Sequence, residues 1–250
     1  MKISRARARL EELTTSIEGW LKENPISVEE REVDSDRVEY VYRQRESVPE
    51  ELGAIIGESL HCARTALDHL AWDLVVAGGG RPDKRTYFPI FDKPRPRSAV
   101  ADAMKGASRQ AVQDVFDLSP WRGGDDELWH LHELDIVDKH RLLLAVGSAH
   151  RNVAIGGGRW NPWGDERGFE MPILFLRPAD QQFPMQDGAV LFSTLRSAVA
   201  DGMTLARFAG ATIEILFGPD TPCPGKPLAG YTLQLISRAE AVIDLLKPHL

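Results

Sequence analysis

The feature that most constrains this fold is a return to helical spacing at the end of the chain, after a long strand-like stretch. Between residues 228 and 246 the apolar positions recur every three or four residues, at Leu233, Ile236, Ala239, Ile243 and Leu246. This spacing predicts an amphipathic helix. Such a helix buries its apolar stripe only by packing on the helices that precede the strand-like stretch. The sequence therefore predicts one α+β domain over residues 1–250, with residues 228–250 returning to a helical bundle.

Helical patterns dominate the first part of the chain. Residues 3–22 carry apolar side chains at helical spacing, and a second helix is expected from Val48-Pro49 to the glycines at 78–80. A third begins at three consecutive acidic residues, which stabilise a helix N-terminus, and its apolar spacing extends over residues 125–146. Short helical pieces are expected between residues 98 and 117. Residues 1–150 are thus expected to be mainly helical.

Two regions have the alternation that is typical of strands. Apolar residues alternate with polar ones on both sides of Asp34-Ser35-Asp36, which predicts a hairpin over residues 26–47. Strand-like runs at 169–176, 189–192 and 211–217, separated by Gly, Pro and Asp, predict an antiparallel sheet over residues 151–220. The expected fold class is α+β, a helical bundle with a small antiparallel sheet and a hairpin.

Composition excludes several classes of protein. With 43% hydrophobic and 27% charged residues, the chain is not of a disordered or fibrous type. A formal charge of −7 argues against a broadly basic nucleic-acid clamp. No apolar run approaches the roughly 20 residues of a membrane span. The two cysteines, Cys62 and Cys223, suggest a reducing compartment. We expect a cytoplasmic protein with no membrane partner.

Histidines are concentrated on two of the predicted helices. Of the seven histidines, five lie within residues 61–69 and 130–140. The apolar stripe expected on the helix over residues 50–77 consists of Ile56, Leu60, Ala63, Leu67, Leu70 and Leu74. His61, Thr65 and His69 follow one another at intervals of four on the face beside it. Arg64 and Asp68 form another pair four residues apart, which suits an ion pair along the helix.

The facing helix places a carboxylate on its own apolar stripe. That stripe consists of Leu128, Leu131, Leu134, Leu142 and Ala145. Asp138 falls on the same side, where burying it unpaired would cost several kcal/mol by usual magnitudes. We therefore predict that helices 50–77 and 125–146 pack directly, with Arg64 or His69 in contact with Asp138 or His140.

The segment Arg64-Thr-Ala-Leu-Asp-His69 resembles the R-x4-H motif of the HEPN superfamily, helical proteins that include many ribonuclease toxins. Residues 66–72, ALDHLAW, and 138–141, DKHR, also resemble segments of uncharacterised bacterial and phage-borne proteins. The HEPN resemblance implies a metal-independent ribonuclease with a toxin or defence role and no cofactor. His69 would be the acid/base and Arg64 the phosphate clamp.

The predicted packing of the two helices would add Asp68 of the first helix and Asp138 and His140 of the second to this catalytic set. The substrate would be single-stranded RNA, and the chain would be a homodimer, because two copies of the motif meet across a dimer in related proteins.

Two other interpretations use overlapping residues. Glu58-x-x-His61 has the E-x-x-H spacing that four-helix carboxylate proteins use to bind metals. Such a site would be completed by Glu133, Asp138 and His140. Alternatively, Arg64 and Asp138 form a structural ion pair in a non-enzymatic binding module. The binding features of that module would be the sheet, the apolar segment at residues 88–91, and the aromatics Trp160 and Trp163.

Overall fold

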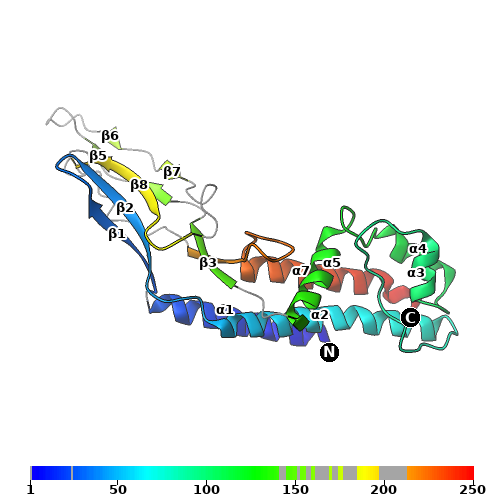
Figure 1. The fold of residues 1–250 in the computed structure, drawn as a ribbon. Helices are drawn as coiled ribbons and strands as arrows, with labels where there is room; N and C mark the ends of the chain where they lie inside the picture. The colour runs from blue at the N-terminus through cyan, green and yellow to red at the C-terminus, as the bar shows by residue number, and fades with distance from the viewer. Residues whose placement is uncertain are drawn as a thin grey trace. The chain divides into compact units, whose positions relative to one another are not determined.

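The computed structural model describes residues 2–23, 25–140, 145–150, 153–155, 159–160, 169–170, 174–176, 185–196 and 213–250 (Figure 1). The chain divides into two compact units. Unit 1 comprises Met1–Ser16, Pro49–Leu144 and Asp220–Leu250, and unit 2 comprises Ile17–Val48 and Ala145–Pro219. This division differs from the single domain expected over residues 1–250. The fold class is α+β, as predicted.

Unit 1 is a helical bundle, and its central helices pack against one another. Helices α2 (Glu50–Ala77), α5 (Asp126–His140) and α7 (Leu228–Leu246) contact each other pairwise (Figure 1). The C-terminal helix therefore returns to the bundle, as its apolar stripe required. No helix in the described part of the chain is both long and apolar enough to cross a membrane.

Smaller helices complete unit 1. Helix α1 (Lys2–Lys22) contributes its first part, up to Ser16. Helices α3 (Arg97–Ala103) and α4 (Arg109–Asp117) contact each other, and the 3-10 turn η3 (Lys247–His249) follows α7. The short helical pieces predicted between residues 98 and 117 are thus confirmed.

The apolar stripe predicted for α2 forms the core of unit 1. Its members are each at most 4% exposed: Ile56, Leu60, Ala63, Leu67, Leu70 and Leu74. On α5, the predicted residues Leu128, Leu131 and Leu134 are fully buried. The direct packing of these two helices is confirmed, because each buries its stripe against the other and against α7.

The third predicted helix is shorter than its spacing indicated. Helix α5 ends at His140, whereas the sequence predicted a helix to residue 146. Residues Ala145–His150 form strand β3, in which Ala145 pairs with Phe217 of strand β9 (Ile213–Phe217). Pairing with a distant strand overrides the local helical spacing there. Leu142, also assigned to the helical stripe, lies outside the described residues.

Unit 2 contains the predicted hairpin. Strands β1 (Ile26–Glu32) and β2 (Arg37–Gln44) pair antiparallel, from Ile26 opposite Gln44 to Glu32 opposite Val38. Asp34 forms the turn, because its carboxylate accepts hydrogen bonds from the backbone N–H groups of Asp36 and Arg37, each 2.8 Å long.

The sheet predicted for residues 151–220 is observed as several antiparallel pairings. Strand β8 (Val190–Leu195) pairs with β2, giving a three-stranded sheet of order β1-β2-β8. Strand β4 (Val153–Ile155) pairs with β7 (Leu174–Leu176), and β5 (Arg159–Trp160) pairs with β6 (Phe169–Glu170). Trp163, one of the predicted exposed aromatics, lies outside the described residues, as does the side chain of Trp160.

Within unit 1, the segment that follows α2 packs closely against its neighbours. A Cβ atom added to Gly80 would lie 2.6 Å from the Cα atom of Gly106, so only glycine allows this close approach. Further along, the backbone N–H of Phe91 donates to the Pro120 carbonyl at 2.9 Å, and Phe88 is fully buried. The apolar segment at residues 88–91 is therefore part of the core.

Candidate functional site

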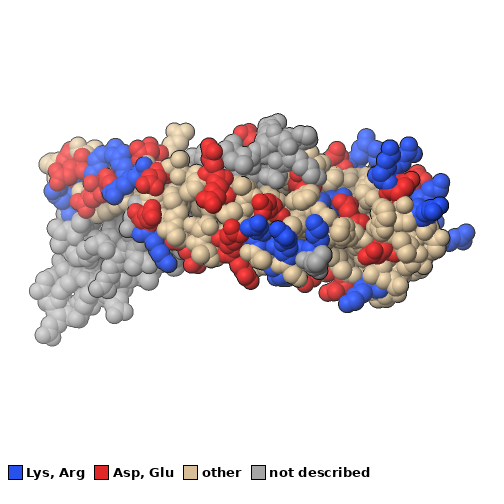
Figure 2. All heavy atoms as spheres, turned by 90° about the horizontal axis from the view of Figure 1, so that it is seen from below, with Lys and Arg blue, Asp and Glu red and all other residues tan. Residues whose placement is uncertain are grey.

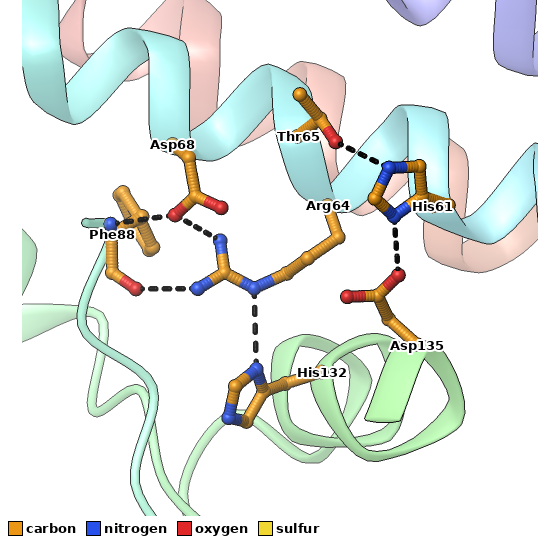
Figure 3. A network of polar contacts seen from close by, with 7 residues as sticks. All are labelled: His61, Arg64, Thr65, Asp68, Phe88, His132 and Asp135. Carbon is orange, nitrogen blue, oxygen red and sulfur yellow. Dashed lines mark hydrogen bonds and ion pairs between the residues drawn. The ribbon is translucent and has the colours of Figure 1, made fainter. Parts of the chain in front are cut away.

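The Arg64 guanidinium joins three parts of unit 1. The residue lies on α2 and is only 5% exposed. It donates hydrogen bonds to the Asp68 carboxylate (2.7 Å), the Phe88 carbonyl (2.9 Å) and Nδ1 of His132 on α5 (3.2 Å) (Figure 3). Three of its five N–H donors are thus used inside the protein.

Arg64 and Asp68 together hold the backbone of Phe88 at both polar groups. Oδ1 of Asp68 accepts a hydrogen bond from the Phe88 N–H at 2.9 Å, while the Phe88 carbonyl accepts from Arg64 (Figure 3). Because Phe88 is fully buried, its peptide groups need such partners. The pair therefore docks the apolar segment onto α2.

Next to this pair, His61 and Asp135 form a second polar contact between α2 and α5. Nδ1 of His61 donates to Oδ1 of Asp135, 2.8 Å away (Figure 3). The Asp135 side chain is 4% exposed, whereas the His61 side chain is 52% exposed. On the other edge of the ring, Nε2 lies 3.4 Å from the hydroxyl of Thr65. A buried carboxylate therefore orients an accessible imidazole.

This arrangement suits acid–base chemistry. A carboxylate on Nδ1 fixes the tautomer, leaves Nε2 as a proton acceptor, and stabilises the imidazolium that forms when Nε2 takes up a proton. The guanidinium of Arg64 projects from the same side of α2 toward α5 (Figure 3). An imidazole, a carboxylate and a cation thus come together.

His69, the histidine of the R-x4-H motif, lies apart from this cluster. It is exposed and lines a hollow whose other walls are Asp68, Trp72, Asp73 and Thr86. The guanidinium of Arg64 is directed to α5 and Phe88 instead. The structure therefore separates the two residues of the motif onto different faces of α2.

The predicted contacts of Asp138 and His140 lie outside the described side chains, and so does the Arg64–Asp138 ion pair. The partners that the structure shows on α5 are His132 for Arg64 and Asp135 for His61. Sequence reasoning did not identify these two α5 residues. Asp135 follows Leu131 by four positions, so the same stripe argument that selected Asp138 also applied to it.

The residues of the predicted metal site have other partners. Glu58 forms a 2.7 Å ion pair with Arg9, and His61 bonds to Asp135. Burial, followed by the nearby charge of Asp92, raises the pKa of Glu133. Among the residues that the structure describes, no three His, Cys, Asp or Glu side chains are placed to hold a metal ion. His140, the fourth predicted ligand, has a side chain outside that description.

A further histidine of α5 has a structural role. Nδ1 of His130 accepts a 2.6 Å hydrogen bond from the Tyr231 hydroxyl on α7, and the two rings meet edge to face. Burial lowers the pKa of His130, so the neutral ring is favoured in the folded chain. This contact stabilises the packing of α5 on α7.

The charged side chains on the surface do not indicate where a ligand would bind. On the face of the chain drawn in Figure 2, Lys and Arg are interspersed with Asp and Glu and do not form one continuous basic area. A comparison of the chain with known protein families, curated proteins and solved structures finds no match. The resemblance to the HEPN superfamily accordingly stays a prediction.

Proposed function

We propose that unit 1 carries a metal-independent ribonuclease site in which His61 is the general base. The single observation that carries the proposal is the 2.8 Å contact between the half-exposed imidazole of His61 and the buried carboxylate of Asp135. A structural histidine needs no such exposure, whereas a general base needs both an oriented ring and access to substrate.

RNA is the substrate class because its cleavage needs only the groups present here. The 2′-hydroxyl of the ribose is an internal nucleophile. A base removes its proton and a cation stabilises the charge that develops on the phosphate. Nε2 of His61 would take that proton as the 2′-oxygen bonds to phosphorus, and Asp135 would stabilise the imidazolium. The imidazolium would then give the proton to the departing 5′-oxygen as its bond to phosphorus breaks, which leaves a 2′,3′-cyclic phosphate and a 5′-hydroxyl.

The role proposed for Arg64 differs from that of a free phosphate clamp. Its guanidinium is 5% exposed and already bonded to Asp68, Phe88 and His132. We assign it a positioning and electrostatic role beside His61. Among the described residues, no carboxylate orients the ring of His69, so we assign the general base to His61 instead.

The experiment compares the two histidines of α2 by the same substitution. Purified wild-type protein is expected to cleave single-stranded RNA in the presence of a chelator. His61→Gln is expected to lose about 10²- to 10⁴-fold in rate, the usual contribution of a general base. His69→Gln serves as the matched control and is expected to retain the wild-type rate.

Chemical rescue separates a catalytic loss from a folding defect. Because the His61 side chain is 52% exposed, free imidazole is expected to restore part of the rate of a His61→Ala variant. Loss of activity in His69→Gln with full activity in His61→Gln would overturn the assignment to His61. An inactive wild type on single-stranded RNA would overturn the ribonuclease proposal itself.

A further inference from the structure

A second site lies about two to three turns along α2 from the His61–Asp135 pair. It is a hollow of about 440 Å³, lined by Asp68, His69, Trp72, Asp73 and Thr86. This volume is within the range of small-molecule sites in proteins. Four of the five lining residues come from two successive turns of α2, and Thr86 comes from the segment that follows it.

One wall of the hollow is an accessible indole. Trp72 is 46% exposed, although tryptophan carries one of the largest apolar surfaces of any residue. Within the described part of the chain, the side chains of His69, Trp72 and Asp73 make no hydrogen bond or ion pair. Aromatic surface and polar atoms are thus both available to a ligand.

Carboxylate oxygens form the other walls, and one of them is fixed in direction. Oδ1 of Asp68 is held by Arg64 and by the Phe88 N–H, whereas its Oδ2 accepts no hydrogen bond from the described residues. The Arg64 charge compensates that of Asp68, while the Asp73 carboxylate forms no ion pair among the described residues. Asp73 therefore brings a carboxylate without a salt-bridge partner to the wall of the hollow.

Thr86 is also held in place, by two hydrogen bonds to the backbone of Asp83. Its backbone N–H donates to the Asp83 carbonyl at 2.9 Å, and its hydroxyl accepts a hydrogen bond from the Asp83 N–H at 3.1 Å. The turn formed by these residues keeps the threonine against α2. A prearranged wall costs less entropy on binding than a mobile one.

We propose that this hollow binds a guanidinium group. A planar cation fits the face of an indole through a cation–π contact, and its N–H donors match the oxygens of Asp68, Asp73 and Thr86. Among the residues that the structure describes, no Lys or Arg lines the hollow, so it does not suit a phosphate. This proposal stands independently of the ribonuclease proposal, because it uses neither His61 nor Asp135.

A second hollow offers room for the chain that carries the guanidinium. It measures about 330 Å³, and it shares His69 and Asp73 with the first. Its apolar wall includes Ile3, Leu70 and Ile243. An aliphatic stem would lie along this wall while the cation contacts Trp72. The guanidinium therefore comes either from a small guanidine compound or from an arginine side chain of a polypeptide.

The test follows the indole N–H signal of Trp72 by NMR in the full chain, assigned with Trp72→Phe. Titration with N-acetylarginine amide is expected to shift this signal with a Kd of about 1 mM, as suits a small ligand. The matched probe is N-acetylcitrulline amide, which has the same shape without the charge. It is expected to cause no shift at the same concentrations.

Substitutions in the hollow test which side chains contact the guanidinium. Trp72→Leu, followed by calorimetry because the indole is lost, is expected to weaken binding about 5- to 30-fold. Asp73→Asn is expected to weaken it about 3- to 10-fold. The control is Asp102→Asn, which removes an exposed carboxylate on α3 that does not line the hollow and is expected to leave the Kd unchanged.

The two sources of the guanidinium are distinguished by a second pair of probes. Tighter binding of agmatine than of an arginine-containing tripeptide would identify a small guanidine compound, and the reverse would identify a polypeptide; either result supports the proposal. Equal shifts with citrulline or lysine amides, or no shift of the Trp72 signal at millimolar probe, would overturn it. RNA cleavage is unaffected by these outcomes, so each proposal fails separately.

Discussion

Substitution of Arg64 by methionine distinguishes a structural guanidinium from one kept free for a ligand. Methionine retains much of the aliphatic length that packs in the core, and it removes only the charge and the N–H donors. The three hydrogen bonds of Arg64 reach Asp68, Phe88 and His132. The cost of the substitution is therefore the cost of leaving these three acceptors without their donor.

The expected loss of stability depends on how exposed each of the three acceptors is. The Asp68 side chain is 38% exposed, so water replaces the guanidinium and the lost ion pair costs at most about 1 kcal/mol. The hydrogen bond to the Phe88 carbonyl is buried, and an orphaned buried acceptor costs about 1 to 3 kcal/mol. The bond to His132 contributes about 1 kcal/mol. We expect Arg64→Met to destabilise unit 1 by about 3 kcal/mol.

Hydrogen exchange is the appropriate assay because the chain has two compact units. Unfolding followed by one global signal would mix their transitions. The amides of α2 and α5 report the free energy of opening unit 1 directly. The matched control is Arg9→Met, because Arg9 pairs with Glu12 and Glu58 at the surface, where water replaces the lost contacts and the loss of stability is expected to be much smaller.

The result that would refute this reasoning is an Arg64→Met protein no less stable than Arg9→Met. That outcome would mean that the guanidinium does not tie Phe88 and α5 to α2. A double variant adds a second check. If Arg64 and Asp68 act on Phe88 as a unit, Arg64→Met with Asp68→Asn is expected to cost less than the sum of the two single changes.

Three further predictions concern other contacts of unit 1. Because burial lowers the pKa of His130, its contribution to stability is present above the unfolded-state pKa of about 6.5 and is lost as the pH falls through the lower folded-state value. Exchange of α5 amides at about pH 7 and about pH 5 is therefore expected to show a smaller difference in His130→Gln than in wild type. Burial raises the pKa of Glu133, so Glu133→Gln is expected to stabilise unit 1 slightly at neutral pH, an advantage in the exchange of α5 amides that disappears below about pH 4.3. Gly80→Ala is expected to lower the protection of α2 amides more than Gly79→Ala, because its Cβ meets the backbone of Gly106, whereas Gly79 has open space and only the strain of a positive φ.

The sequence by itself determined the helices, the hairpin and the core stripe. Helical and strand periodicities are local properties, so the spacing of Leu60, Leu67 and Leu74 was enough to predict which face of α2 is buried. The same holds for the turn at Asp34, whose carboxylate bonds to the backbone within its own hairpin. The return of α7 to the bundle was also predictable, because its apolar stripe had to be covered.

The tertiary structure alone decided which polar groups meet. The sequence placed carboxylates on the apolar stripe of α5, but the axial offset between α2 and α5 determines that Asp135 faces His61. Arg64 likewise donates a hydrogen bond to the Phe88 carbonyl, and Phe88 lies in a loop whose path no local pattern predicts. The end of α5 depends on the pairing of β3 with β9, residues that are far apart in the chain. Periodicity along one element carries no information on its alignment with another, and contacts between distant segments depend on that alignment.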